Sequence, residues 1–451
     1  MTPFKLTDEL IEEIEHLIDN NDKHALLDLM KDIHYADVAE IIDELNLDEA
    51  TYLIKLLESK KTSDVLTELD EGIRDRILEN LTAKEIADEI RELDTDDAAD
   101  IISELPDERR EEVISYIDDH EHAKDIVELL RYDEDTAGGL MAKELVKVNE
   151  NWTVLNCIGE MRAQAENVTR VHSIYVVDDN EKLLGRLSLK DLLTASTKSA
   201  IKDVYIRKVD YVSVHETAEE VARIMAKYDL EAIPVVDETN RLVGRITIDD
   251  IVDVIRDEAE RDYNMAAGIS GDIEAKDSIL KLTKARLPWL LIGTFGGMMA
   301  AGIISSFQEG MGDYIILLSF VPLIQATAGN VGVQSSAIVV QGLANDSIDG
   351  EIMGRLFKEF LLALVNGGSI AFLVLLISHF GFGTEYLISA TIGIAIISVI
   401  IIAAIIGTFI PIFLDKKGID PAVATGPFIT TSNDIFGILV YFSIAKLILG
   451  F

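Results

Sequence analysis

The chain has a single cysteine, Cys157, among 451 residues. This excludes an intramolecular disulfide and a metal cluster held by several cysteines, and it fits a reducing compartment. The first residues, MTPFKLTDELIEEIEHL, also lack the basic start and apolar core of a secretory signal peptide. We therefore expect the first half of the chain to stay in the cytoplasm.

Positive charge is scarce as well. The chain has 40 basic and 80 acidic residues. Residues 286–451 contain 6 of the basic and 10 of the acidic ones, so the part before them has 34 basic and 70 acidic residues and a net charge of −36. A nucleic-acid partner is disfavoured, because phosphate binding needs a basic face. Cations are the partners that such an acidic field attracts.

The last part of the chain consists of five apolar runs, each reaching the length of about 20 residues that spans a membrane as a helix. They cover residues 288–307, 313–344, 357–379, 386–414 and 421–449. Five such runs make buried helices of a soluble protein improbable. The basic connections all fall on one side, which the positive-inside rule makes cytoplasmic. We expect a multi-pass protein of the cell (inner) membrane with its C-terminus outside.

Spans 2 and 5 contain many polar residues, which are costly at membrane depth unless they meet protein or water. Hydrogen bonding between helices is the alternative explanation for Ser335, Ser336 and Thr425. It is weaker for Asp434, which we interpret as the only carboxylate inside a span rather than at its edge. Mg²⁺ prefers oxygen ligands and keeps several of its waters. Asp434 therefore predicts a site for a hydrated divalent cation.

The acidic half contains two kinds of internal repeat. In residues 1–135 the pattern VAEIIDEL (38–45) recurs as IADEIREL (86–93) and AADIISEL (98–105), which predicts a small helical solenoid. Residues 172–193 match residues 231–252, and each copy has a β run, a turn, Gly-Arg, a second β run and a helix start. This second repeat resembles a tandem pair of CBS domains.

Each copy of the second repeat has that family's nucleotide motif. Its residues are Gly185, Ser188 and Asp191 in the first copy, and Gly244, Thr247 and Asp250 in the second. The resemblance implies ATP or AMP as a cofactor, with the aspartate on a ribose hydroxyl and the Ser or Thr on a phosphate. The structural alternative, that Thr247 caps the helix it precedes, stays open.

The segment between the CBS pair and the first span reads as one long helix over 256–286, with weak points at Gly268 and Gly271. Carboxylates crowd its start and the residues just before it, where like charges on one face repel. A solvated helix is the alternative to a regulatory metal site at these positions. The candidate ligands are Asp249, Asp250, Asp253, Asp257, Glu258, Glu260 and Asp262.

The complete order of segments resembles the MgtE family of magnesium channels. The most specific residues are Pro322 with 329–335 in span 2, and 421–437 in span 5. The resemblance implies a homodimer with a pore between subunits, a filter aspartate at Asp434, and a connecting helix that closes the pore when Mg²⁺ fills acidic cytoplasmic sites. The candidate pore residues are Asp434, Asn330, Gly329, Thr431 and Asn433.

The predicted fold is a multidomain membrane protein. An all-α acidic helical-repeat domain (1–135) precedes an α+β tandem CBS pair (136–200 and 201–255), the connecting helix (256–286) and a pore domain of five helices (287–451). The predicted function is a Mg²⁺-selective channel closed by cytoplasmic Mg²⁺. An ion-coupled divalent cation transporter is the alternative. A CBS-regulated membrane enzyme is remote, because the spans lack the H-E-x-x-H motif of a metalloprotease.

Overall fold

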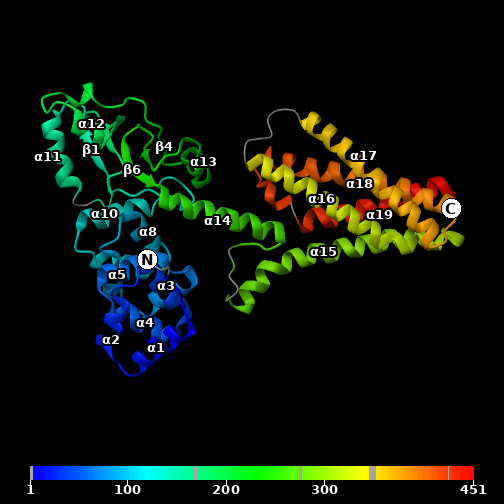
Figure 1. Ribbon diagram of the computed structural model, residues 1–451, viewed down its shortest axis with the longest axis horizontal. Coiled ribbons are helices and arrows are strands. Elements are labelled where there is room, and N and C mark those ends of the chain that lie inside the picture. The colour runs from blue at the N-terminus through cyan, green and yellow to red at the C-terminus, as the bar shows by residue number, and fades with distance from the viewer. Residues whose placement is uncertain are drawn as a thin grey trace. The chain divides into compact units, whose positions relative to one another are not determined.

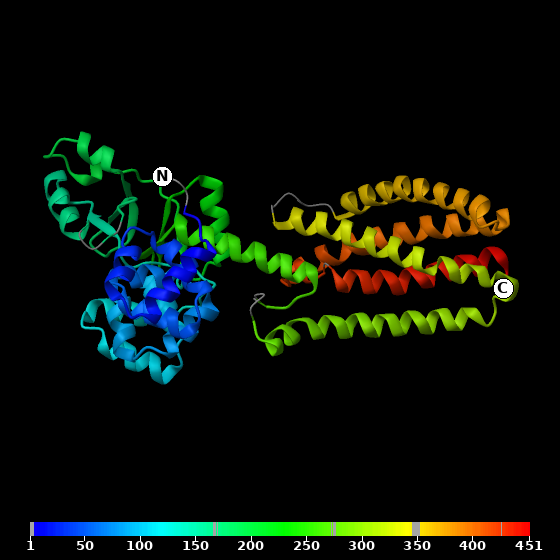
Figure 2. The ribbon, with the colours of Figure 1, turned by 60° about the horizontal axis from the view of Figure 1, so that its bottom comes forward.

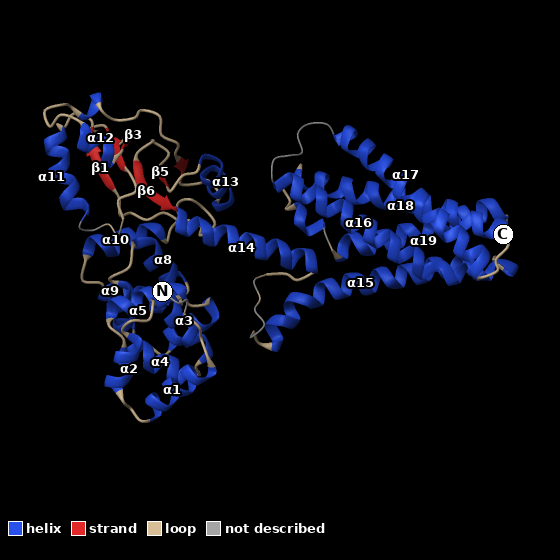
Figure 3. Ribbon diagram, viewed as in Figure 1, coloured by secondary structure: helices blue, strands red, loops and turns tan. Residues whose placement is uncertain are grey.

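The computed structural model describes residues 4–165, 168, 170–271, 273, 277–344, 352–424 and 426–451. The chain divides into two compact units, Met1–Arg256 and Asp257–Phe451 (Figure 1). The first unit contains helices and both sheets, and the second contains the long apolar helices (Figure 3).

Short helices make up the first part of unit 1. Many of them begin at a polar capping residue, such as Asn46 and Thr82, each of which forms a capping box with a glutamate three residues later. Their bounds are α1 (Asp8–Asp19), α2 (Lys23–Met30), α3 (Tyr35–Glu44), α4 (Leu47–Leu56), α5 (Ser59–Glu68), α6 (Glu71–Glu79), α7 (Ala83–Ile90), α8 (Thr95–Ser103), α9 (Asp107–Tyr116) and α10 (His120–Leu129).

One contact of this helical part occurs twice. The Lys61 ammonium donates a hydrogen bond to the carbonyl of Ile33, 28 residues earlier. The Arg109 guanidinium donates to the carbonyl of Leu81, also 28 residues earlier. In both cases a long basic side chain satisfies a carbonyl just after a helix end, which would otherwise lack a partner. The repeated sequence pattern therefore corresponds to a repeated contact in the structure.

Two three-stranded sheets follow, each with one parallel and one antiparallel pair. The middle strand of each sheet, β2 or β5, consists largely of β-branched residues whose side chains are buried. The first sheet contains β1 (Val146–Asn149), β2 (Ile174–Val177) and β3 (Leu183–Leu187), with helices α11 (Val154–Gln164) and α12 (Leu189–Thr194). The second contains β4 (Val212–Ser213), β5 (Ala232–Val236) and β6 (Leu242–Thr247), with helix α13 (Ala218–Tyr228).

The predicted continuous helix over 256–286 is wrong. Helix α14 (Ile248–Ala267) ends before Gly268, and helix α15 begins only at Ile279. Gly268 and Gly271 have φ values of +77° and +81°, in the left-handed region that a right-handed helix cannot include. These two glycines end the helix rather than weaken it.

Unit 2 contains five helices, among the described residues, that are long and apolar enough to cross a membrane. The helices α15 to α19 run alongside one another (Figure 2). Helix α18 packs against α16, α17 and α19, whereas α15 packs against α19. Their bounds are α15 (Ile279–Gln308), α16 (Val321–Ala344, after a 3₁₀ segment Gly312–Phe320), α17 (Ile352–Leu376), α18 (Tyr386–Asp415) and α19 (Pro427–Leu449).

Candidate functional site

Asp434 of α19 lies beside Gly329 of α16. A Cβ atom at Gly329 would lie 3.9 Å from Asp434 Oδ1 and 3.2 Å from the methyl group of Thr430. A side chain at this position would press against Thr430, so the glycine favours the close approach of the two helices. Asp434 is half-buried, and the described residues give it neither a hydrogen bond nor an ion pair. A carboxylate of this kind, within a helix that can span a membrane, has its charge available for a cation.

The other predicted pore residues point in different directions. Asn330 is exposed on α16. Thr431 packs its methyl group against Gly296 of α15, where a Cβ atom would collide with it. Asn433 is 1% exposed and lies against Gly332 of α16. The structure thus brings Gly329 and Asp434 together, and it places Thr431 and Asn433 at helix contacts; their predicted roles toward an ion stay predictions.

A second carboxylate lies inside a span, so the interpretation of Asp434 as the only one is wrong. Glu359 is buried in α17 and accepts a hydrogen bond of 2.5 Å from the hydroxyl of Ser335 in α16. The sequence placed it at an edge, because the apolar run begins near residue 357. Helix α17 begins at Ile352 instead, which puts Glu359 about two turns inside it. The presence of a polar residue, Ser335, in the neighbouring span was the signal that could have indicated a buried position for Glu359.

The end of α14 touches the beginning of the helix that contains Asp434. Gly268 lies so close to the Pro427 ring that a Cβ atom would collide with it, and one at Gly426 would collide with the carbonyl of Ala266. The Trp289 indole of α15 donates a hydrogen bond of 2.7 Å to Ser270. Pro427 precedes Asp434 by about two turns of α19. The connecting segment therefore contacts the start of α19, about two turns before the candidate ion site.

Acidic residues of α8 and α14 form a cluster in unit 1. The pKa of Asp96 lies well above its usual value, mainly because the carboxyl group is buried and also because Asp97 and Asp250 repel its charge. The pKa of Asp97 is raised to about 7, mainly by burial and also by repulsion from Asp250. Burial raises the pKa of Asp250 to about 6. The negative charges are close enough to resist ionisation together. A divalent cation would relieve this repulsion.

Contacts from the CBS pair hold α8 in this position. The Thr95 hydroxyl donates a 2.8 Å hydrogen bond to Glu144, and Arg245 of β6 lies 3.8 Å from the carboxylate of Asp94. The sequence pattern predicts Asp249 and Asp250 as metal ligands, but it does not indicate Asp96 and Asp97. The available signal was the run Asp94-Thr95-Asp96-Asp97 before a buried helix face.

The remaining predicted metal ligands follow one another along α14. Asp253 repels Glu68 and, after burial, contributes to the raised pKa of Glu68. Arg256 and Arg261 lie 3.6 and 3.4 Å from Asp253 and Glu258, respectively. Within the described part of the chain, no group of three or more His, Cys, Asp or Glu side chains is arranged to hold a metal ion. Asp257, Glu260 and Asp262 are likewise spread over α14.

The two nucleotide motifs have different surroundings. Ser188 is exposed and Asp191 is half-buried, and the Ser188 hydroxyl donates to Asp191 at 2.6 Å. Thr247 is buried and donates to Asp250 at 2.8 Å, so that Asp250 belongs to the acidic cluster. Both motif glycines, Gly185 and Gly244, lie against neighbouring backbone where a Cβ atom would collide. The motif thus has a packing role in both copies and an accessible carboxylate in the first.

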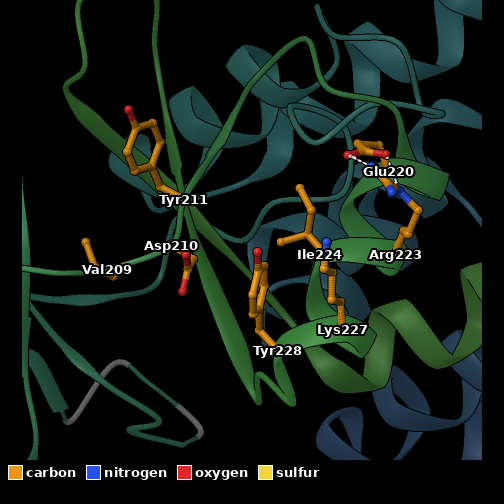
Figure 4. A pocket seen from close by; sticks show the side chains of 8 residues that line it. All are labelled: Val209, Asp210, Tyr211, Glu220, Arg223, Ile224, Lys227 and Tyr228. Atoms are coloured by element: carbon orange, nitrogen blue, oxygen red, sulfur yellow. Dashed lines mark hydrogen bonds and ion pairs between the residues drawn. The ribbon is translucent and has the colours of Figure 1, made fainter. Parts of the chain in front are cut away.

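A cavity of about 330 Å³ lies between α13 and the residues that precede β4 (Figure 4). The exposed rings of Tyr211 and Tyr228 border it, together with Lys227. Arg223 on the same helix forms 2.7 and 2.6 Å hydrogen bonds with Glu220. The lining includes none of the motif residues.

Comparison with known proteins identifies the family. The chain is 32% identical to the magnesium transporter MgtE of Thermus thermophilus over 98% of its own length and 99% of the relative's. It is 37% identical to the magnesium transporter MgtE of Enterococcus faecalis over 73% of each chain. The chain belongs to the MgtE family. Its family profiles are the MgtE intracellular N domain at 33–135, CBS domains at 137–198 and 201–257, and the divalent cation transporter MgtE at 321–444.

The structural comparison agrees with this assignment. The crystal structure of the cytosolic domain of the Mg²⁺ channel MgtE in complex with ATP is 34% identical, with a TM-score of 0.51 over 54% of this chain and 99% of that one. The predicted MgtE family and the predicted fold class are therefore confirmed. The chain is therefore a membrane protein of a family of magnesium transporters, which is the name that its relatives from Enterococcus faecalis, Bacillus subtilis and Thermus thermophilus carry.

Proposed function

We propose that the chain is a Mg²⁺-selective channel for divalent cation uptake, in which ions pass Asp434. The observation that carries this proposal is the position of Asp434, half-buried beside Gly329 without a basic partner among the described residues. One carboxylate together with backbone and amide oxygens suits a Mg²⁺ ion that keeps most of its waters. A site that replaced all the waters would need more charged ligands.

We further propose that the channel is a homodimer in the cell (inner) membrane, with the N-terminal domains in the cytoplasm and the C-terminus outside. Asn330 and Gln334 are exposed and one turn apart on α16. A polar stripe on a spanning helix needs protein or water against it. A second copy that places its own α16 and α19 opposite would supply both.

The functional test uses purified full-length protein in vesicles that contain a Mg²⁺-sensitive dye. A channel should admit Mg²⁺ along its own gradient when the Na⁺ and H⁺ gradients have been collapsed. Loss of flux under that condition would favour the ion-coupled transporter. Absence of any Mg²⁺ flux above that of protein-free vesicles would overturn the proposal.

For regulation, we propose that cytoplasmic Mg²⁺ binds the cluster of α8 and α14 and the further acids of α14, and thereby closes the channel. Crowded carboxylates with raised pKa values support the first location. The density of acids from Asp253 to Asp262 supports the second. Monovalent salt screens such charges but cannot bridge them.

The acidic cluster predicts an unusual dependence of stability on pH. Without Mg²⁺, Asp97 and Asp250 keep their protons in the folded state up to pKa values of about 7 and about 6, while the ordinary value is 3.8. Raised folded-state pKa values contribute stability at low pH that is lost as the pH rises from about 4 to about 7. We expect the melting temperature of unit 1, followed in the full-length protein, to fall across this window. Mg²⁺ should restore it at pH 7.5 and have little effect at pH 5.

The variant Asp97→Asn isolates this effect. It should flatten the pH dependence and reduce the response to Mg²⁺, because one repelling charge is gone. Asp107→Asn is the matched control, since the Asp107 side chain is 97% exposed. An Asp97→Asn protein with the same pH and Mg²⁺ response as the control would show that the cluster does not bind the ion.

The related cytosolic domain that was crystallised with ATP suggests a nucleotide here as well, and we propose the first CBS motif as its site. Asp191→Ala should weaken ATP binding by about tenfold, the effect of losing about 1.4 kcal/mol, because the half-buried carboxylate is the one that the motif places on a ribose hydroxyl. Asp250→Ala should change the affinity for ATP less. Calorimetry on the full-length protein would decide, and a larger loss with Asp250→Ala would assign ATP to the second motif.

A further inference from the structure

Three buried polar side chains of unit 2 have no hydrogen-bond partner among the described residues. Ser336 and Thr408 are 0% exposed and Asn433 is 1% exposed. Within the described part of the chain, both hydroxyls and both polar atoms of the Asn433 amide lack a hydrogen-bond partner. Buried polar groups are costly when left so, and buried sites that contain several of them commonly hold ordered water.

All three side chains belong to the crossing of α16, α18 and α19. At Gly407 of α18, a Cβ atom would lie 2.5 Å from the carbonyl oxygen of Gly332 in α16. At Gly332, a Cβ atom would collide with the amide of Asn433. Thr408 follows Gly407, and Ser336 lies one turn after Gly332 on the same side of α16. The helices thus approach most closely where their polar side chains are buried.

We infer that this crossing is an internal binding site for ordered water. Its side chains supply two hydroxyls and an amide, which together offer donors and acceptors without charge. Such a set suits a neutral molecule that makes about three hydrogen bonds, and it suits a bare cation poorly because the amide nitrogen only donates. The site is separate from Asp434, which lies against Gly329 about one turn away along α16.

The water site gives Asn433 a role in ion passage. Asn433 directly precedes Asp434, so an amide fixed by water against Gly332 also fixes the rotation of α19 that directs Asp434 toward Gly329. Asn433 is then a positioning residue rather than an ion ligand. This step rests on the proposed channel function, whereas the water site does not.

Thr408→Val gives opposite results for a hydrated and a dry crossing. Valine has the shape of threonine without the hydroxyl. If water occupies the site, the variant loses a hydrogen bond and leaves the water's other partners unsatisfied, which should lower the melting temperature of the full-length protein by about 2–4 °C. If the crossing is dry, removal of an orphan hydroxyl should raise it.

The matched control is Thr391→Val in the same helix. Thr391 is 1% exposed and donates at 2.7 Å to the carbonyl of Leu387, which keeps its backbone partner after the change. Its melting temperature should barely move. Thr408→Ser, which retains the hydroxyl, should conserve Mg²⁺ flux better than Thr408→Val, because the rotation of α19 is preserved.

Ser336→Ala provides a second test if Thr408→Val does not fold. It should also lower the melting temperature, and the double variant should lose less than the sum of the two, because both lose the same water. A melting temperature that rises or stays unchanged with these substitutions would overturn the water site. Lower stability with unchanged flux in all variants would retain the site and overturn the positioning role of Asn433.

Discussion

Replacing Asp434 by alanine should reduce Mg²⁺ flux by at least tenfold, which corresponds to about 1.4 kcal/mol, and should leave folding intact. The carboxylate is half-buried and has no hydrogen bond or ion pair among the described residues, so its removal breaks no polar contact between α16 and α19. Under the proposed function it is the charge that offsets the partial loss of hydration as Mg²⁺ enters the span. Flux of purified protein in vesicles, with the melting temperature measured in parallel, would test both parts.

Two further variants sharpen this experiment. Asp434→Asn retains an oxygen that can bind the waters of the ion, so its flux should lie between those of wild type and Asp434→Ala. Asp415→Ala is the matched control, because Asp415 is an exposed carboxylate at the end of α18. Wild-type flux and selectivity in the Asp434→Ala protein would place the ion path elsewhere.

Much of the architecture could be predicted from the sequence, because it depends on periodic local patterns. Apolar length alone located the five helices, with ends that differ by up to nine residues from those observed. The repeated β runs located both sheets, since the spacing of the two copies is constant. The repeated helical patterns correspond to a contact that recurs in the structure, from Lys61 to Ile33 and from Arg109 to Leu81.

Features that need a tertiary partner could not be predicted in this way. Asp97 and Asp250 are far apart in the sequence, and only the packing of α8 against the CBS pair brings their charges together. Asn433 lies in a helix with polar residues on several sides, so its direction became clear only from its contact with Gly332. Glu359 was misplaced because hydropathy does not register a buried hydrogen bond such as that with Ser335.

The contact between α14 and α19 leads to the prediction with the largest expected effect on regulation. Gly426 has φ 58° and ψ −128°, a conformation that is essentially restricted to glycine. A Cβ atom there would also collide with the carbonyl of Ala266. Gly426→Ala should therefore push the end of α14 away from the base of α19. Gly268→Ala should act from the other side of the contact, through the rigid ring of Pro427.

If α14 closes the channel by resting on α19, Gly426→Ala should weaken the inhibition by cytoplasmic Mg²⁺. An allosteric coupling of about 1–3 kcal/mol corresponds to a shift of about 5–150-fold in the half-inhibitory concentration. Gly271→Ala is the matched control: its φ of +81° also lies in the left-handed region, yet no atom of the described residues lies within 4 Å of the added Cβ. Electrophysiology on bilayers with Mg²⁺ varied on the cytoplasmic side would measure all three variants. Identical inhibition curves for Gly426→Ala and Gly271→Ala would mean that backbone strain, and not the α14–α19 contact, governs the response, and closure would then have to act through another surface.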